Sequence, residues 1–315
     1  MRVLVTGAAG QLGRDLVDAL SGAVPAGGLE GAPSTGRLGA RPPVEVVATD
    51  VAGLDAVRSD HRAPLDITDR TAVGSVMEAF RPDIVIHGAA WTAVEACESD
   101  PDLAFTVNAL GTRNMAEGAR RHGAHLVYIS TDYVFDGTSP RPYLEWDAPH
   151  PLSVYGRSKW GGEQELDPGS TIVRTSWVSG AHGQNMVGTV LRLAAGSGPL
   201  RFVSDQHGCP TFTADLAGAV TVLATERLPG IFHVTNQGAT SWYEFAAAVL
   251  TAAGHDPSRV EPITTADLDP PLLAPRPANS VLDNAALRLS GLPLLPDWHE
   301  ALARLVPALL LEKTR

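Results

Sequence analysis

Hydrophobic residues recur along most of the chain in two alternating patterns. Short, almost continuous apolar runs predict buried strands, and apolar residues spaced three or four positions apart predict helices. The runs lie at 2–6, 44–50, 83–90, 125–130, 171–176 and 231–235, and the helical pattern covers 11–20, 70–80, 101–121 and 153–166. This alternation is typical of a parallel sheet that helices cover on both faces.

The pattern changes in two places. Residues 21–43 are rich in glycine and proline and lack apolar periodicity, so we expect a flexible surface insertion there. After about Trp177 the alternation weakens, and helical patterns at 185–196 and 241–254 are followed by a proline-rich loop at 267–277. The second half of the chain therefore differs in organisation from the first.

We predict an α/β protein with a Rossmann-type, doubly wound parallel sheet and a smaller, mixed C-terminal lobe. Residues 1–176 would form mainly the NAD(P)-binding domain, to which strands at about 200–235 return. Residues 177–315 would form mainly the substrate-binding lobe. It is expected to cover the carboxyl edge of the sheet, where open α/β sheets bind ligands.

Composition excludes several classes of protein. No apolar run approaches the ~20 residues needed to cross a bilayer, and Met1 is followed directly by the first predicted strand, without a signal peptide. The net charge of -11 disfavours a broad surface for nucleic acid or membrane. Two distant cysteines, Cys97 and Cys209, argue against a disulfide framework. We therefore expect a cytoplasmic protein with no nucleic-acid or membrane partner.

The segment TGAAGQLG, Thr6–Gly13, places three glycines between the first predicted strand and the first predicted helix. Gly7 would permit a sharp turn, Gly10 would leave room for a diphosphate, and Gly13 would let the helix pack closely. The free N–H groups and dipole of the helix N-terminus attract phosphate. A tight turn alone also uses glycine, but the strand–turn–helix context favours dinucleotide binding.

Asp50 ends the second predicted strand, where such folds carry an acidic residue for the adenosine ribose. It lies further from Gly13 than the about 20 residues usual for this fingerprint, and the insertion at 21–43 accounts for the difference. Its carboxylate would accept hydrogen bonds from the ribose and repel a 2′-phosphate. That favours NADH, although the sequence leaves the choice between NADH and NADPH open.

A second group of residues suits carbonyl reduction. Tyr155 and Lys159 lie one helical turn apart in SVYGRSKWGGE, and Thr131 follows the strand at 125–130. A nearby ammonium lowers the pKa of a phenol, so Tyr155 could protonate a carbonyl oxygen that receives hydride. Thr131 could donate to the same oxygen, and Lys159 could hold the nicotinamide ribose. Glu163, one turn further on, is expected to pair with Lys159.

A Tyr and a Lys at this spacing also occur in ordinary amphipathic helices. Together with the glycine motif and with the segment STD at the end of a predicted strand, the Tyr–Lys pair indicates a catalytic site. Such a site lies at the strand ends above the cofactor.

These motifs resemble the extended short-chain dehydrogenase/reductases, through TGAAGQLG, STDYVFDG and YGRSK. The segments AAWTAVEACES, RTSWV, SDQHGCPT, SWYEFA, RPANS and LPDW resemble the dTDP-4-dehydrorhamnose reductase family in particular. The similarity runs from residue 1 to about 305, apart from the insertion. It implies hydride transfer from NAD(P)H to C4 of dTDP-4-dehydro-β-L-rhamnose, which gives dTDP-L-rhamnose, with Thr131, Tyr155 and Lys159 as the catalytic residues.

The resemblance also implies which residues bind the two ligands. Those for the cofactor are Gly10, Gln11, Leu12, Asp50, Asp66, Ile67, Ala90, Trp91, Thr92 and Lys159, to which the glycine motif and the catalytic pair add Gly7, Gly13 and Tyr155. Those for the sugar are Thr131, Asp132 and Trp177. Arg276 would bind the diphosphate, since guanidinium suits phosphate oxygens. A turn-capping role for Asp132 and core packing for Trp177 are the alternatives.

The family uses magnesium at a dimer interface through carboxylates, and Asp15 stands at one such position. The ten histidines show no metal-ligand spacing such as H-E-x-x-H. We therefore predict no metal residue, and magnesium and a homodimer both stay open.

The sequence leaves three other functions open. The high content of Ala, Gly and Pro hints at a GC-rich genome, which keeps a dTDP-dihydrostreptose synthase or another antibiotic deoxysugar reductase as an alternative. A non-catalytic, dinucleotide-binding regulatory subunit would have no use for Tyr155 and Lys159. A nucleotide-sugar epimerase would retain NAD and show no net redox change.

Overall fold

The computed structural model describes residues 1–23, 44–59 and 61–312, so nearly all of the expected insertion at 21–43 lies outside the described residues. A 7-stranded sheet runs in the order β11-β6-β5-β4-β1-β2-β3, and all neighbouring strands are parallel. The strands are β1 (Arg2–Thr6), β2 (Glu45–Asp50), β3 (His61–Pro64), β4 (Ile84–His87), β5 (His125–Thr131), β6 (Thr171–Thr175) and β11 (Gly230–His233). The predicted doubly wound parallel fold is confirmed.

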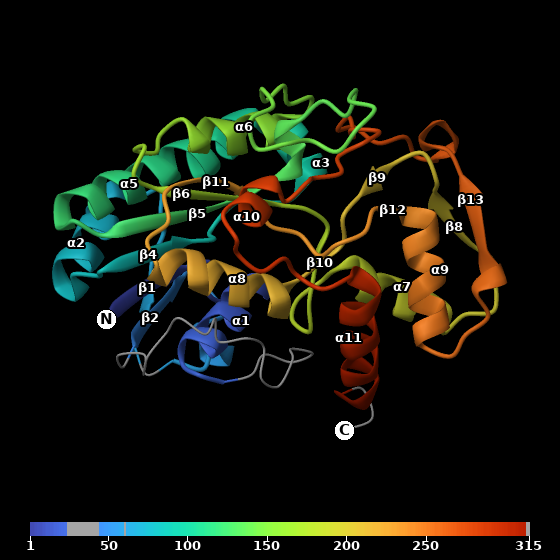
Figure 1. Cartoon of the computed structure of the whole chain (residues 1–315), viewed down its shortest axis with the longest axis horizontal. Helices are drawn as coiled ribbons and strands as arrows, with labels where there is room; N and C mark the ends of the chain where they lie inside the picture. The colour runs from blue at the N-terminus through green and yellow to red at the C-terminus, as the bar shows by residue number, and fades with distance from the viewer. Residues whose placement is uncertain (24–43, 60, 313–315) are drawn as a thin grey trace.

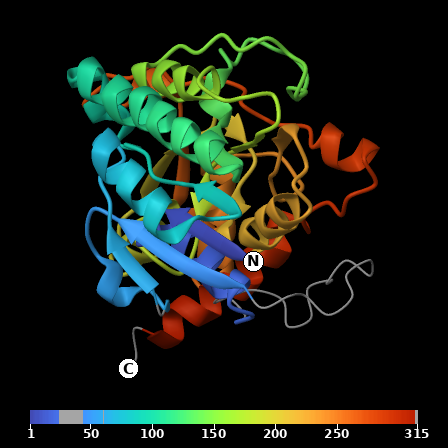
Figure 2. The ribbon, with the colours of Figure 1, turned by 90° about the vertical axis from the view of Figure 1, so that its left-hand side faces the viewer.

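Helices cover both faces of this sheet, as Figures 1 and 2 show. One face carries α1 (Gln11–Leu20) and α8 (Thr213–Thr225), and the other carries α2 (Arg70–Phe80), α5 (Gly111–His122) and α6 (Val154–Glu163). Leu16 and Leu216 belong to the buried cluster on the first face, and Met77 and Met115 to the cluster on the second. Near-continuous apolar strands are buried because both faces are covered in this way.

The remaining chain forms a smaller lobe beside the carboxyl edge of the sheet (Figure 1). Its core packs Phe212, Phe245 and Trp298 among aliphatic side chains. Its helices are α7 (Met186–Ala194), α9 (Trp242–Ala252) and α11 (Trp298–Glu312). Its short strands pair as β7 (Val178–Ser179) with β10 (Thr211–Phe212), β9 (His207–Gly208) with β12 (Thr240–Ser241), and β8 (Leu200–Val203) with β13 (Val260–Ile263).

The short elements complete the description. They are η1 (Leu54–Ala56), α3 (Val94–Ser99), α4 (Pro101–Phe105), η2 (Thr106–Leu110), η3 (Asp132–Val134), η4 (Pro257–Arg259), η5 (Thr265–Asp267) and α10 (Ala285–Leu289). No helix among the described residues is both long enough and apolar enough to span a bilayer.

Three helical regions differ from the expectations. The helix expected at 101–121 is interrupted by the π-helical turn η2, which carries the buried Asn108. The helices α8 and α11 were not predicted. Apolar and small residues run almost all round α8, so it shows no polar face, and α11 contains Pro307. The sequence of α8 therefore lacks the amphipathic stripe from which helices are recognised, and an internal proline, as in α11, argues against a helix.

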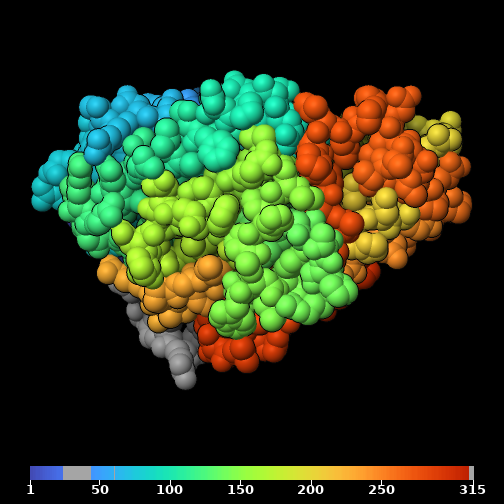
Figure 3. Space-filling view, turned by 90° about the horizontal axis from the view of Figure 1, so that it is seen from above, coloured from blue at the N-terminus to red at the C-terminus, as the bar shows by residue number. Residues whose placement is uncertain are grey.

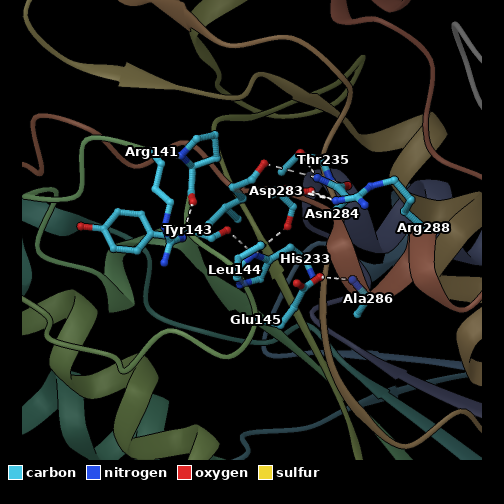
Figure 4. A network of polar contacts seen from close by, with 12 residues as sticks. Arg141, Tyr143, Leu144, Glu145, His233, Thr235, Asp283, Asn284, Ala286 and Arg288 are labelled. Carbon is cyan, nitrogen blue, oxygen red and sulfur yellow. Dashed lines mark hydrogen bonds and ion pairs between the residues drawn. The ribbon is translucent and has the colours of Figure 1, made fainter.

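A buried polar network ties the C-terminal segment to the outer strand β11 (Figure 4). Glu145 accepts hydrogen bonds from the backbone N–H groups of His233 (3.1 Å) and Ala286 (2.9 Å). The side chain of Asn284 accepts from the N–H of Thr235 at 2.9 Å. Burial lowers the pKa of His233 to about 3, so its ring is neutral at ordinary pH. The network anchors the chain that follows RPANS against the edge of the sheet.

Candidate active site

One cavity of ≈ 770 Å³ lies at the carboxyl edge of the sheet. Its volume falls in the range of small-molecule sites, about 300–1,000 Å³. It is lined by Gly7, Gly10, Gln11, Leu12, Gly13, Asp50, Asp66, Ile67, Ala90, Trp91, Thr92, Thr131, Asp132, Tyr155, Lys159 and Trp177. These are all of the predicted site residues apart from Arg276.

The glycine turn forms one end of this cavity. Gly7 has a φ of 69°, and a Cβ on Gly13 would lie 2.1 Å from the carbonyl oxygen of Gly7. Only a residue without a side chain allows that approach. Gly10 is the N-cap of α1 and places no side chain there, so the first backbone N–H groups of the helix border the cavity. The expected turn and close packing are both present, and the cradle fits a dinucleotide phosphate.

Asp50 closes the same end at the last residue of β2. Its carboxylate accepts hydrogen bonds from the N–H of Ala9 at 3.0 Å and the N–H of Val51 at 2.7 Å. These two contacts fix the carboxylate against the glycine turn. Each carboxylate oxygen keeps acceptor capacity for a further donor such as a ribose hydroxyl.

Asn108, in the π-helical turn η2, fixes the loop that carries Ala90, Trp91 and Thr92 through hydrogen bonds to its backbone. The backbone N–H of Trp91 donates to Asn108 Oδ1 at 2.8 Å, and Asn108 Nδ2 donates to the carbonyl of Trp91 at 3.0 Å. Asn108 Nδ2 also donates to Ser158 Oγ at 2.9 Å. The helix irregularity missed from the sequence therefore positions a loop of the cavity and connects it to α6.

Tyr155, Thr131 and Asp132 form the polar centre of the cavity. The Thr131 hydroxyl donates to Asp132 Oδ1 at 3.1 Å and accepts from the N–H of Tyr133 at 3.2 Å. The lowering of the Tyr155 pKa expected from Lys159 is not found: burial raises the pKa of the phenol, the hydrogen bond with Thr131 opposes that rise, and a charge on Asp132 would add to it. The phenol is thus neutral and able to release a proton only to a strong acceptor.

Asp132 is almost fully buried, with 2% of its surface exposed. Burial raises the pKa of its carboxyl to about 7, against hydrogen bonds with Ser280 and Thr131 that lower it. Its Oδ2 has no hydrogen-bond partner at ordinary geometry among the described residues. The raised pKa favours the neutral form of the Asp132 carboxyl, which repels a developing phenolate at Tyr155 less than the ionised form does.

Lys159 does not pair with Glu163, which corrects one expectation. The Nζ of Lys159 donates to the carbonyl of Ile129 at 2.8 Å and lies 4.1 Å from the centre of the Tyr128 ring. Burial lowers the pKa of Lys159 to about 7, although the charge of Glu163 opposes the shift. Lys159 is therefore protonated only below about neutral pH in this state.

Glu163 instead binds Ser130 and Arg174. Its Oε1 accepts from Ser130 Oγ at 2.6 Å, and its two oxygens accept from Arg174 at 2.9 and 2.7 Å. Both charged side chains are 2% exposed. A buried guanidinium needs a carboxylate in this fork geometry, which explains why Glu163 faces Arg174 and not Lys159.

Trp177 and Trp242 stack at the other end of the cavity. Their ring centroids are 3.5 Å apart, their planes differ by 6°, and both line the cavity. Trp242 was missed as a site residue. Its segment SWYEFA gave a predicted helix and a family resemblance but no role in the site, because the approach of Trp242 to Trp177 depends on contacts between distant parts of the chain.

Arg276 lies outside the cavity lining. Its guanidinium pairs with Glu95 of α3 at 2.6 Å and lies 5.7 Å from the centre of the Tyr133 ring. The N–H groups of Leu273 and Ala274 also donate to Glu95, so the proline-rich segment is fastened to α3. Figure 3 shows this segment, in red-orange, beside the earlier helices on the upper surface.

Among the described residues, Asp15 is not part of a metal site. It is buried, burial raises its pKa to about 6, and its Oδ1 lies 3.7 Å from His182 Nε2. The described residues contain no group of three or more His, Cys, Asp or Glu side chains that could hold an ion. The residues around Asp15 therefore do not fit magnesium on their own.

The family model described as RmlD substrate binding domain matches residues 1–310. The chain is 41% identical to dTDP-4-dehydrorhamnose reductase of Streptomyces griseus, over 98% of this chain and 94% of the relative. It is 40% identical to a probable dTDP-4,6-dihydroxy-2-methyloxan-3-one 4-ketoreductase of Streptomyces antibioticus, over 98% of this chain and 96% of the relative.

A solved structure has the same fold over nearly its whole length. It is dTDP-4-dehydrorhamnose reductase from Bacillus anthracis str. Ames in complex with NADP. It superposes with a TM-score of 0.81 and 37% identity, and covers 96% of this chain and 98% of its own.

Proposed function

The chain belongs to the RmlD substrate binding domain family, that of the dTDP-4-dehydrorhamnose reductases, and from this we propose that it reduces the C4 ketone of dTDP-4-dehydro-β-L-rhamnose to dTDP-L-rhamnose. The observation that carries the proposal is one cavity lined both by the glycine turn and by Tyr155 and Thr131. A dinucleotide cradle and a proton donor in a single cavity are what carbonyl reduction requires.

The reduced nicotinamide cofactor, when bound, supplies the hydride. The residues that would hold it are the glycine turn and the first N–H groups of α1 for the diphosphate, Asp50 for the adenosine ribose, and Lys159 for the nicotinamide ribose. Asp66 and Ile67 would contact the adenine, and the loop of Ala90, Trp91 and Thr92 would contact the nicotinamide half. We propose NADH as the preferred cofactor, because the Asp50 carboxylate would repel a 2′-phosphate.

Tyr155 gives its phenolic proton to the ketone oxygen as that oxygen becomes an alcohol. The high pKa of the phenol keeps it protonated until the oxygen gains charge, and the proton then moves to the stronger base. With the sugar bound, the Thr131 hydroxyl would turn away from Asp132 Oδ1, donate its hydrogen to the same ketone oxygen and thereby stabilise the developing charge. Burial raises the pKa of the Asp132 carboxyl, which favours its neutral form and so opposes a second negative charge in this small volume.

The direct test is turnover by the purified protein. Loss of NADH absorbance in the presence of dTDP-4-dehydrorhamnose, with dTDP-L-rhamnose identified by NMR, would support the proposal. Tight binding of NADH without loss of absorbance would instead indicate a regulatory subunit. An unchanged NADH level with an epimerised sugar would indicate an epimerase.

A second candidate is reduction of a different dTDP-linked 4-keto sugar. The relative from Streptomyces antibioticus is a probable 4-ketoreductase of another dTDP sugar, and it is 40% identical, almost as similar as the reductase at 41%. A dihydrostreptose synthase belongs to this group of alternatives. The same NMR analysis separates them, because a ring-contracted product would lack the six-membered ring of rhamnose.

The cellular setting follows from the proposed chemistry. Reduced nicotinamide and dTDP sugars suit a cytoplasmic enzyme, and both cysteines of the chain are free and buried. A homodimer remains a prediction.

A further inference from the structure

Trp242 is the point at which the smaller lobe reaches the cavity. Among the described residues that line the cavity, Trp242 is the only one beyond Val178 in the chain. The same side chain packs against the core of the lobe, and its ring meets Phe245 edge-on at 6.0 Å. Trp242 is therefore the residue through which the part of the lobe beyond Val178 lines this cavity, next to Trp177 and Val178 at its start.

Trp177 is held in an unusual conformation next to it. Its φ of 47° is in the left-handed region, which costs about 1–3 kcal/mol for a residue other than glycine. The strain persists only when surrounding contacts impose it. One ring face is covered by Trp242, and a Cβ on Gly208 would lie 2.5 Å from Trp177 Cε2. The side chain at 208 must therefore be absent for the ring to lie there.

Three distant segments build this arrangement, which we call the indole clamp (Trp177, Gly208 and Trp242). Gly208 pairs with Thr240 in the short β9–β12 ladder, two residues before Trp242. Trp242 begins α9, whose first turn is fixed by the Ser241–Glu244 capping box. Trp177 precedes β7, which pairs with β10. The clamp is thus fixed by backbone pairing on every side.

The position of the clamp identifies the part of the ligand that it faces. Thr131 is paired with Thr175 across β5 and β6, and Trp177 follows Thr175 by two residues. The clamp therefore lies next to the residues that face the reacting carbonyl, on the side away from the glycine turn. Flat aromatic surfaces favour the C–H faces and methyl group of a deoxyhexose by burial of apolar area.

We propose that Trp242 is a specificity-determining residue, which holds Trp177 in its strained conformation and presents the lobe's contact surface to the deoxysugar ring. This proposal rests on the proposed function for the identity of the sugar nucleotide. It predicts that Trp242 affects recognition of the sugar and leaves the dinucleotide and the thymidine diphosphate portion unaffected.

The test compares Trp242→Ala with the conservative Trp242→Phe, and uses Trp146→Ala as the control, because Trp146 is 67% exposed on a distant loop. Trp242→Ala is expected to raise KM for the keto sugar about tenfold with a much smaller change in kcat, and Trp242→Phe to recover most of the loss. NADH affinity should stay unchanged in all three variants.

A binding measurement separates this inference from the proposed function. Calorimetry with dTDP-L-rhamnose and with dTDP as probes should show about tenfold weaker binding of the former to Trp242→Ala and equal binding of the latter. The exciton signal of the stacked indoles in circular dichroism should disappear in the same variant. If wild type shows no turnover but these results hold, only the proposed function fails.

The inference is overturned if the exciton signal survives in Trp242→Ala, or if the variant binds dTDP-L-rhamnose as wild type does. Equal weakening for dTDP and dTDP-L-rhamnose would also overturn it, because it would show a general effect on the lobe and not a contact with the sugar.

Discussion

The two ends of the cavity are built in opposite ways. At the cofactor end the chain leaves side chains out, and Gly7 and Gly13 allow backbone to approach backbone. At the substrate end it places two indoles in face-to-face contact and holds one of them at a positive φ. The glycine turn of the first end is made by residues close together in the sequence, whereas the indole clamp of the second is assembled from residues that lie far apart in the chain. Changes at the two ends should therefore have separable consequences.

The largest effect is expected between the two ends, at the proton donor. Tyr155→Phe should lower kcat by about a thousandfold, since general acid catalysis contributes on the order of 10²–10⁴. The phenyl ring keeps the shape of the site, so NADH affinity should change little. Steady-state kinetics with fluorescence titration of NADH checks both, and near-normal turnover by the variant would refute the assignment of Tyr155.

The next largest effect is expected at the cofactor end. Gly13→Ala would place a Cβ 2.1 Å from the Gly7 carbonyl oxygen, so the start of α1 must move away from the turn. We expect unfolding to become easier by about 3 kcal/mol and NADH binding to weaken strongly. Gly74→Ala in α2 is the matched control, because nothing lies within 4 Å of a Cβ there. Urea unfolding should show the control to be slightly stabilised.

A pH-dependent effect is expected at Asp132. Its pKa is about 7 when folded and 3.8 when exposed, so the folded protein keeps a proton that the unfolded chain loses. Its contribution to stability is therefore present at low pH and is lost as pH rises to about 7.

Asp132→Asn removes this ionisation. The gain in unfolding free energy should be greater at pH 8 than at pH 5, by on the order of 2 kcal/mol. The exposed Asp102→Asn serves as the control in urea unfolding at both pH values. If Asp132→Asn changes the unfolding free energy by the same amount at pH 5 and at pH 8, the carboxyl of Asp132 is ionised in the folded protein at both pH values.

The smallest effect concerns the choice of cofactor. Asp50→Asn removes the negative charge and keeps one acceptor oxygen, so it retains only one of the two contacts that Asp50 Oδ2 and Oδ1 make with the N–H groups of Ala9 and Val51. The ratio of kcat/KM for NADPH to that for NADH should rise about tenfold, or about 1.4 kcal/mol. KM for the sugar should not change, since Asp50 lies at the opposite end. If the ratio of kcat/KM for NADPH to that for NADH does not change, residues other than Asp50 determine the preference between the two cofactors.

The same difference between the ends explains what could be predicted from the sequence. Strand β1 and helices α1 and α2 have the predicted bounds. Short apolar runs, a glycine turn and an amphipathic stripe are local signals in the sequence. The cavity then brings together residues from Gly7 to Trp177, because parallel strands place their carboxyl ends at one edge.

The remaining features depend on partners far away in the chain. Glu163 is one turn from Lys159, but its binding to Arg174 follows only from how β6 faces α6. The stacking of Trp242 on Trp177 and the contact of Arg276 with Glu95 arise from the folding of the lobe over the sheet. Neither contact leaves a periodic pattern in the sequence.

The central claim is that this single cavity joins a reduced nicotinamide to the ketone of a dTDP sugar. Turnover with NADH that carries deuterium at the transferable C4 position, in ordinary water, tests it most directly. Our account predicts one deuterium at C4 of the rhamnose product by NMR, with a solvent proton on the new hydroxyl. A product without deuterium at C4, or deuterium retained by the cofactor while the sugar changes, would contradict it.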